Sequence, residues 1–188
     1  MVGGKSNMSR IGRLPIAIPA GVTVEVNNNV VTVKGPKATL TQDFSKNVTV
    51  EVKDNEVLVT RNDETKDSNA KQGLYRQLIN NMVIGVKDGF SKSLTVKGVG
   101  YKLAKQGKKL VMNLGLSHPV EIEEEDGITL EVPDNNTILV KGADKQKVGA
   151  VAAKIRATRP MEPYHGYGIH YTSEPVILKP GKAAGKKK

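Results

Sequence analysis

Two stretches of this chain repeat one pattern, Val48-Thr-Val-Glu-Val-Lys-Asp-Asn55 and Ile128-Thr-Leu-Glu-Val-Pro-Asp-Asn135. In both, aliphatic residues alternate with polar ones and lead into an Asp-Asn pair, which predicts a strand that ends in a turn. A second apolar run follows each stretch, Val57-Leu-Val59 in the first case and Ile138-Leu-Val140 in the second, and then a helical pattern begins. Self-similarity this detailed indicates an α+β unit that has been duplicated.

The register of the repeat depends on the helices. Residues 22–35, a predicted hairpin around Asn27-Asn-Asn29, also resemble residues 128–142, but only the copy at Val48 leads into a helix. The first predicted helix starts at a cap, Asp67 or Ser68, and its expected buried face comprises Ala70, Leu74, Leu78 and Met82, flanked by Tyr75, Ile79, Val83 and Val86.

The second predicted helix starts at a cap, Asp144, and its expected buried residues are Val148, Val151, Ala152 and Ile155. Further strands are predicted at 38–42, 93–99, 101–105, 109–114 and 120–122. The fold class that follows is α+β, with two tandem, duplicated domains, each a mainly antiparallel β-sheet packed against one long α-helix, and an extended basic C-terminal arm. The predicted divisions are a disordered leader at 1–7, an N-terminal domain at 8–88, a C-terminal domain at 89–175 and a basic tail at 176–188.

Composition narrows the class of protein. The 188 residues include no cysteine, which excludes a disulfide framework and thiolate chemistry and is typical of a reducing compartment, so the expected location is the cytoplasm. No apolar run reaches the length of about 20 residues that a membrane helix needs. The formal net charge of +10 favours a polyanionic partner, and the absence of a basic amphipathic helix favours nucleic acid over a membrane surface.

Charge is also unevenly distributed along the chain. Residues 91–120 contain six lysines and no acid, whereas acids gather at 63–67 and at 121–126. The lysines of the acid-free tract are Lys92, Lys97, Lys102, Lys105, Lys108 and Lys109. This pattern predicts a surface divided by sign, with the basic tracts on the side of the partner.

A Gly-, Pro- and Tyr-rich stretch, Arg159-Pro-Met-Glu-Pro-Tyr-His-Gly-Tyr-Gly-Ile-His-Tyr171, follows the second helix. It has no period long enough for a buried element and is interpreted as an extended, exposed segment. Glycine lets backbone approach a partner closely, tyrosine offers a stacking surface, and lysines follow at Lys179, Lys182 and 186–188. The segment is therefore predicted to be a nucleic-acid contact arm; the alternative is a flexible tail that binds nothing.

Catalytic and metal-binding patterns are weak. His165 and His170 lie in the arm without ligands at metal-site spacing, so a metal site is disfavoured. Glu123 and Glu125 are better explained as a solvated acidic turn than as an acid/base pair. Gly98-Val-Gly100 lacks the remaining residues of a nucleotide loop and lies between two predicted strands, which favours a β-bulge. No cofactor and no small-molecule substrate are expected.

Six ordered motifs resemble a known family. They are Met8-Ser-Arg-Ile-Gly-Arg-Leu-Pro-Ile-Ala-Ile-Pro-Ala-Gly-Val22, Val33-Lys-Gly-Pro-Lys37, Asn80-Asn-Met-Val83, Gly98-Val-Gly-Tyr101, Leu116-Ser-His-Pro-Val120 and Arg159-Pro-Met-Glu-Pro-Tyr164. From residue 8 to about residue 182 the chain is similar to the sixth protein of the bacterial large ribosomal subunit. The resemblance implies two duplicated α+β domains that bind 23S rRNA near the stalk base and the elongation-factor site, beside neighbouring large-subunit proteins, without enzymatic activity.

The arm departs from the family pattern, in which three basic residues usually stand where this chain has His165, Tyr167 and His170. Stacking groups and glycines are kept, but up to three cations are lost at neutral pH, which weakens the case for phosphate contacts at these positions. The resulting candidate rRNA-binding residues are Lys97, Lys102, Arg156, Arg159, Tyr164, His165, Gly166, Tyr167, Gly168, His170, Tyr171, Lys179, Lys182, Lys186, Lys187 and Lys188.

Two other functions stay open at this stage. The chain could act as a free-standing RNA-binding regulator or RNA chaperone, in which case it would be found mainly apart from ribosomes. An enzyme with an unrecognised site is the third alternative, although no residue in the sequence indicates a substrate.

Overall fold

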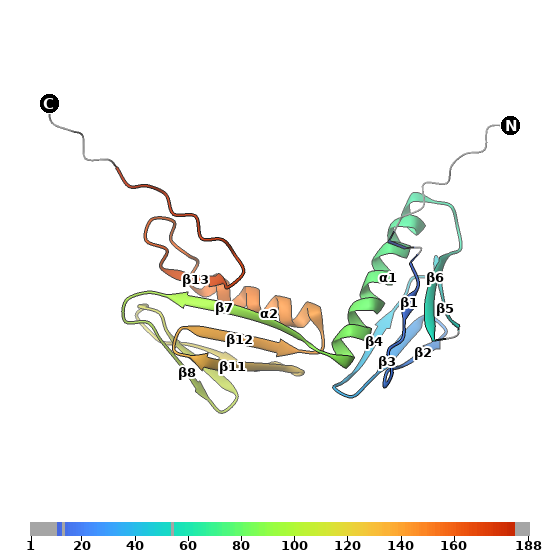
Figure 1. Ribbon diagram of the computed structural model, residues 1–188, viewed down its shortest axis with the longest axis horizontal. Coiled ribbons are helices and arrows are strands. Elements are labelled where there is room, and N and C mark those ends of the chain that lie inside the picture. Colours follow the sequence, from blue (N-terminus) through green and yellow to red (C-terminus); the bar gives the residue numbers. More distant parts are fainter. Residues whose placement is uncertain (1–10, 13, 54, 183–188) are drawn as a thin grey trace. The chain divides into compact units, whose positions relative to one another are not determined.

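The computed structural model describes residues 11–12, 14–53 and 55–182 (Figure 1). These form two compact units, one that ends at Gly89 and also takes in Ala143–Lys145, and one that comprises Phe90–Gly142 and the chain from Gln146 onward. The expectations for residues 1–7 and for Lys186 to Lys188 lie outside the described residues. No helix in the described ranges is long and apolar enough to cross a membrane.

The first unit contains two three-stranded antiparallel sheets, β1-β6-β5 and β2-β3-β4. Asn28 and Asn55 adopt φ of 54° and 66° in the two hairpin turns, a conformation that Asn tolerates better than most residues. The predicted hairpins and third strand are confirmed, whereas β1, only two residues long, has no periodicity by which the sequence could have revealed it. The strands are β1 (Ile16–Ala17), β2 (Thr23–Asn27), β3 (Val30–Lys34), β4 (Thr39–Asp43), β5 (Val48–Lys53) and β6 (Glu56–Arg61).

Helix α1 (Lys66–Lys87) covers the first unit, and the second half of its predicted face, at Ile79, Met82, Val83 and Val86, is confirmed. Its N-cap is Thr65, whose side chain accepts a hydrogen bond from the Ser68 amide at 3.2 Å, rather than Asp67 or Ser68. The predicted face is wrong at its start, since Ala70 is exposed and Leu74 is 54% exposed. The buried residues are Ser68, Gln72, Ile79, Met82, Val83, Gly85 and Val86.

The buried face of α1 includes a polar residue, Gln72, near its start. Gln72 is buried, and its amide donates to the carbonyl oxygens of Val59 at 2.8 Å and Gly12 at 3.3 Å. Buried carbonyl groups need donors, so a glutamine lies at a buried position that a search for apolar residues does not identify.

The second unit repeats the plan with an additional strand. Its sheets are β11-β12-β7-β13 and β10-β9-β8, and every pairing is antiparallel. Helix α2 (Lys145–Thr158) starts directly after the predicted cap and buries the four predicted residues against this core, which confirms the prediction. The strands are β7 (Phe90–Lys97), β8 (Lys102–Gln106), β9 (Lys109–Asn113), β10 (Val120–Glu123), β11 (Ile128–Asp134), β12 (Thr137–Gly142) and β13 (Gly168–Tyr171).

Strand β13 corrects the interpretation of residues 159–171 as wholly extended and exposed. It pairs with β7 along its length and lies beside it in Figure 1. Ile169 is fully buried in the core of the unit, and His170 is 9% exposed. With only four residues and one large aliphatic side chain, this strand gave no recognisable period.

The glycine pair between β7 and β8 is also different from its prediction. Gly98 to Gly100 form a turn rather than a bulge, because β7 and β8 belong to different sheets and the chain must change direction between them. Gly100 adopts a φ of 73°, which a side chain would disfavour.

Candidate nucleic-acid interface

The exposed part of the predicted arm is a loop, residues 162–167, that we call the aromatic loop. The Glu162 carboxylate accepts hydrogen bonds from the amides of Tyr164 at 3.1 Å and His165 at 2.9 Å, and from Nδ1 of His165 at 3.0 Å. These donors, the His165 amide foremost, hold the pKa of Glu162 below its ordinary value. The charged carboxylate thus fastens the loop that surrounds it.

Backbone contacts close the aromatic loop on itself and on the chain that follows. The Glu162 amide donates to the Tyr167 carbonyl at 2.8 Å, and the Gly166 amide donates to the Glu162 carbonyl at 3.0 Å. The Lys179 amide donates to the Pro163 carbonyl at 2.9 Å. The alternative of a free tail therefore does not describe this part of the chain as far as Lys179.

The loop presents three aromatic side chains at the surface. Tyr164 is 54% exposed, Tyr167 is 40% exposed and the His165 side chain is 70% exposed. The rings of His165 and Tyr167 stack on one another, with their centroids 5.6 Å apart and their planes inclined by 13°. Three of the predicted site residues are thus brought together.

Gly166 and Gly168 have reasons inside the unit for being glycine. Gly166 adopts a φ of 73°, and Gly168 adopts a φ of 133°. A Cβ on Gly168 would lie 2.6 Å from the Cα of Met161 and 2.7 Å from the Pro160 carbonyl oxygen, which is too close for any side chain. Close approach of RNA is therefore not needed to explain either glycine.

Two further predicted residues are used within the unit. Arg156 forms an ion pair with Glu174 at 2.8 Å, and its guanidinium carbon lies 5.5 Å from the centre of the Tyr171 ring. The ammonium group of Lys92 lies 4.9 Å from the same ring centre, so Tyr171 contacts two cations. Lys92 and Glu174 are not among the predicted site residues. The fold identifies Lys92 by its contact with the Tyr171 ring, and Glu174 by its ion pair with Arg156, which is 18 residues away in the sequence. His170 is buried in β13, and within the described residues its Nδ1 atom has no hydrogen-bond partner.

The remaining predicted cations within the described residues have no ion pair. Lys97 lies beside the aromatic loop, its Nζ atom 3.9 Å from the point where a Cβ on Gly166 would stand. Considering residues 11–12, 14–53 and 55–182, no carboxylate oxygen lies within 4.0 Å of the charged groups of Lys97, Lys102, Arg159, Lys179 and Lys182.

The prediction of a surface divided by sign along the sequence is wrong for part of the lysine tract. Lys105 pairs with Glu124 at 2.8 Å, and Lys109 pairs with Glu123 at 2.8 Å. Antiparallel pairing in the β10-β9-β8 sheet brings the acidic end of β10 beside lysines that are distant in sequence. These lysines are neutralised inside the unit and are poor candidates for phosphate contacts.

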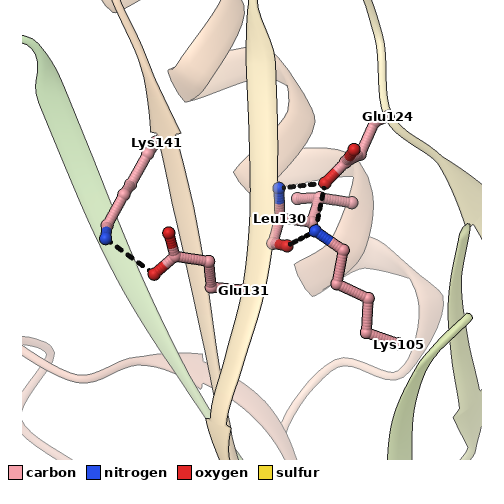
Figure 2. Close-up of polar contacts among 5 residues, drawn as sticks. All are labelled: Lys105, Glu124, Leu130, Glu131 and Lys141. Atoms are coloured by element: carbon pink, nitrogen blue, oxygen red, sulfur yellow. Dashed lines mark hydrogen bonds and ion pairs between the residues drawn. The ribbon is translucent and has the colours of Figure 1, made fainter. Parts of the chain in front are cut away.

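Figure 2 shows that Glu124 and Lys105 also form hydrogen bonds with the backbone of Leu130 in the edge strand β11. The Leu130 amide donates to Glu124 at 2.7 Å, and Lys105 donates to the Leu130 carbonyl oxygen at 2.6 Å. These donors, the Lys105 side chain first, lower the pKa of Glu124. We call the group formed by Lys105, Glu124 and Leu130 the edge clamp; Lys141 and Glu131 form a separate ion pair at 2.6 Å nearby.

The geometry gives no support to metal or acid/base chemistry. Among the described residues no group of three or more His, Cys, Asp or Glu side chains could hold a metal ion. The pKa of Glu123 is lowered by its hydrogen bond from Lys109, the opposite of what a general acid requires. The fold and surface thus define a duplicated α+β protein with an exposed aromatic loop that Lys97 and Lys179 border.

Comparison with known sequences identifies the family. A sequence model described as Ribosomal protein L6 matches residues 18–89 and again residues 97–172, which confirms the duplication. Large ribosomal subunit protein uL6 of Clostridium beijerinckii is 59% identical over 181 residues, covering 96% of this chain and all of the relative. The proteins of the same name from Thermoanaerobacter sp. (strain X514) and Caldicellulosiruptor bescii are 58% and 55% identical, with the same coverage. The chain belongs to the ribosomal protein L6 family, and is a ribosomal protein rather than an enzyme.

Proposed function

We propose that this chain is a structural constituent of the large ribosomal subunit that binds 23S rRNA near the stalk base and the elongation-factor site. The observation that carries the proposal is the position of Lys97, which has no carboxylate partner in the described part of the chain and lies beside a fastened loop with exposed rings. Phosphate neutralisation and stacking are two means by which proteins bind RNA.

The structure narrows the residues proposed for this contact. Arg156, Tyr171 and His170 have roles inside the second unit, so the contact rests on the exposed rings and on the cations without carboxylate partners. The proposed set is Lys97, Lys102, Arg159, Tyr164, His165, Tyr167, Lys179 and Lys182, with Lys186 to Lys188 as an extension. The second domain therefore carries most of the rRNA contacts. Neighbouring large-subunit proteins are the other partners, and the location is the cytoplasm.

The test is the distribution of the protein in a cell lysate separated on a sucrose gradient. We expect the chain to sediment with the large subunit and to stay there after a wash at moderate salt. The competing function, a free-standing RNA-binding regulator or chaperone, predicts a mainly ribosome-free pool during normal growth, and that result would overturn the proposal.

A further inference from the structure

We propose that the stacked rings of His165 and Tyr167 form a stacking site for one unpaired nucleobase of the rRNA. The inference rests on the proposed function and specifies its chemistry: at the aromatic loop the chain contacts a base face, while Lys97 beside it meets the adjoining phosphate. The two contacts differ in their response to salt, which makes them separable by experiment.

The geometry of the pair suits a third ring. The ring planes are inclined by 13° and the centroids lie 5.6 Å apart, which is an offset stack. Each ring contacts the other through one face, and the pair does not use its opposite face. The His165 side chain is 70% exposed and Tyr167 is 40% exposed, so both rings lie at a surface that a base can reach. A base that stacks on either ring extends an existing offset stack.

The pair is also held in place before a base arrives. Glu162 fixes the His165 ring through Nδ1 and the His165 backbone through the amide. The Tyr167 carbonyl is held by the Glu162 amide, and the Gly166 amide closes the turn between the two rings. Because the rings are already ordered, stacking a base costs little additional side-chain entropy.

The charge around the pair favours RNA over a protein partner. The Glu162 carboxylate is occupied by three donors of its own loop, so it does not present an open acceptor to a protein. Lys97 and Lys179 border the loop without a carboxylate partner in the described ranges, and they provide the positive charge that a nucleotide phosphate requires.

Substitutions in the full-length chain separate stacking from charge. A stacked base contributes about 1 to 3 kcal/mol, so Tyr167→Leu should weaken binding to transcribed 23S rRNA about 5- to 150-fold while leaving the slope of log affinity against log salt unchanged. Tyr167→Phe, which keeps the ring, should bind more tightly than Tyr167→Leu. His165→Lys should steepen the slope by about 0.7 to 0.9 if the new cation reaches a phosphate.

The control is Ile177→Ser, which removes an exposed aliphatic side chain, 79% accessible, from the segment that follows. It should bind rRNA like the parent, and equal weakening by Ile177→Ser and Tyr167→Leu would indicate a general apolar contact and overturn the stacking site. Thermal unfolding of each variant establishes that it is folded at the temperature of the titration.

Ultraviolet irradiation of the parent complex provides a readout that needs no substitution. Zero-length crosslinks between protein and 23S rRNA should fall on His165 or Tyr167 when peptides are mapped by mass spectrometry. If the parent binds rRNA but crosslinks elsewhere and Tyr167→Leu binds equally well, the stacking site is wrong and the proposed function stands. If the parent does not bind 23S rRNA at all, both fail.

Discussion

The edge clamp and the aromatic loop are both built from a carboxylate, neighbouring lysines and backbone amides, and they use them in opposite ways. In the edge clamp, Glu124 neutralises Lys105, and together they satisfy both backbone groups of Leu130. In the aromatic loop, Glu162 is bound by its own loop, and Lys97 is left without a carboxylate partner in the described residues.

The difference shows how one basic chain divides its charge between folding and binding. A cation that already meets a carboxylate adds little to binding a polyanion, because the phosphate must displace the acid or tolerate its repulsion. A cation with no carboxylate within 4.0 Å, such as Lys97 among the described residues, has no acid to displace before it meets a phosphate. The number of lysines along the sequence is therefore a poor guide to the binding surface. The pairing of strands decides which lysines already have a carboxylate partner and which can bind phosphate.

The largest expected effect is a loss of folding stability when the edge clamp is broken, which tests its structural role. Glu124→Leu leaves the Leu130 amide without its acceptor and Lys105 without its partner, so we expect a loss of about 1 to 3 kcal/mol in the free energy of unfolding. The Glu124 side chain is 15% exposed. Urea denaturation followed by circular dichroism measures the loss.

The matched control is Glu121→Leu in β10, the strand that ends one residue before Glu124. Glu121 is 54% exposed and lies 3.7 Å from Lys109, so its removal should change stability by less than about 0.5 kcal/mol. Similar losses in the two variants would contradict the assignment of a structural role to the edge clamp.

A smaller effect separates the lysines in binding. Neutralising Lys97 as Lys97→Gln should reduce the slope of log rRNA affinity against log salt by about 0.7 to 0.9, since one phosphate contact is lost. Lys109→Gln should leave the slope nearly unchanged, because Glu121 and Glu123 already neutralise that lysine. Titrations at four or more salt concentrations give both slopes, and an equal reduction for the two variants would break the comparison.

The smallest effect is a dependence on pH. The pKa of Glu124 is lower in the folded protein than its ordinary value of 4.5, so its contribution to stability is complete above about pH 4.5 and is lost as pH falls through the folded value. We expect the parent to lose more stability than Glu124→Leu between pH 5 and pH 3. Parallel pH profiles for the two proteins would show that Glu124 is not responsible.

Glu162 titrates in the same sense, because its pKa is also lowered in the folded protein. Its protonation should loosen the aromatic loop rather than unfold the unit, since its bonds are to residues of that loop. Amide exchange at Tyr164 and His165, followed by NMR as the pH is lowered, would detect this local change.

The sequence predicted the fold more completely than the site. Duplication, both helices and the longer strands followed from period and repeat, because burial of one face leaves a regular pattern. The start of the predicted face of α1 was wrong because buried Gln72 binds carbonyl groups of distant segments, and β13 was missed because only Ile169 in it carries a large aliphatic side chain to the core.

The site depended on distances that a sequence does not contain. The aromatic residues were found from composition, but the stacking of His165 on Tyr167 and the hydrogen bond of His165 to Glu162 are seen only in the fold. Arg156 was assigned to RNA because nothing in the sequence links it to Glu174, which is 18 residues away. Lys105 and Lys109 of the acid-free tract were misassigned for the same reason, since their acidic partners are reached only through the sheet.

The pairing of β13 with β7 has a consequence for the order in which the chain folds during synthesis. The strands and helix of the first unit all lie within residues 16–87, so that unit can close as soon as α1 has been made. Strand β7 comes next but must wait for residues 168–171, with no partner on that side while the intervening strands and α2 emerge. At about 5 to 20 residues per second this delay is several seconds, during which the β7 edge is open to pairing with other nascent chains.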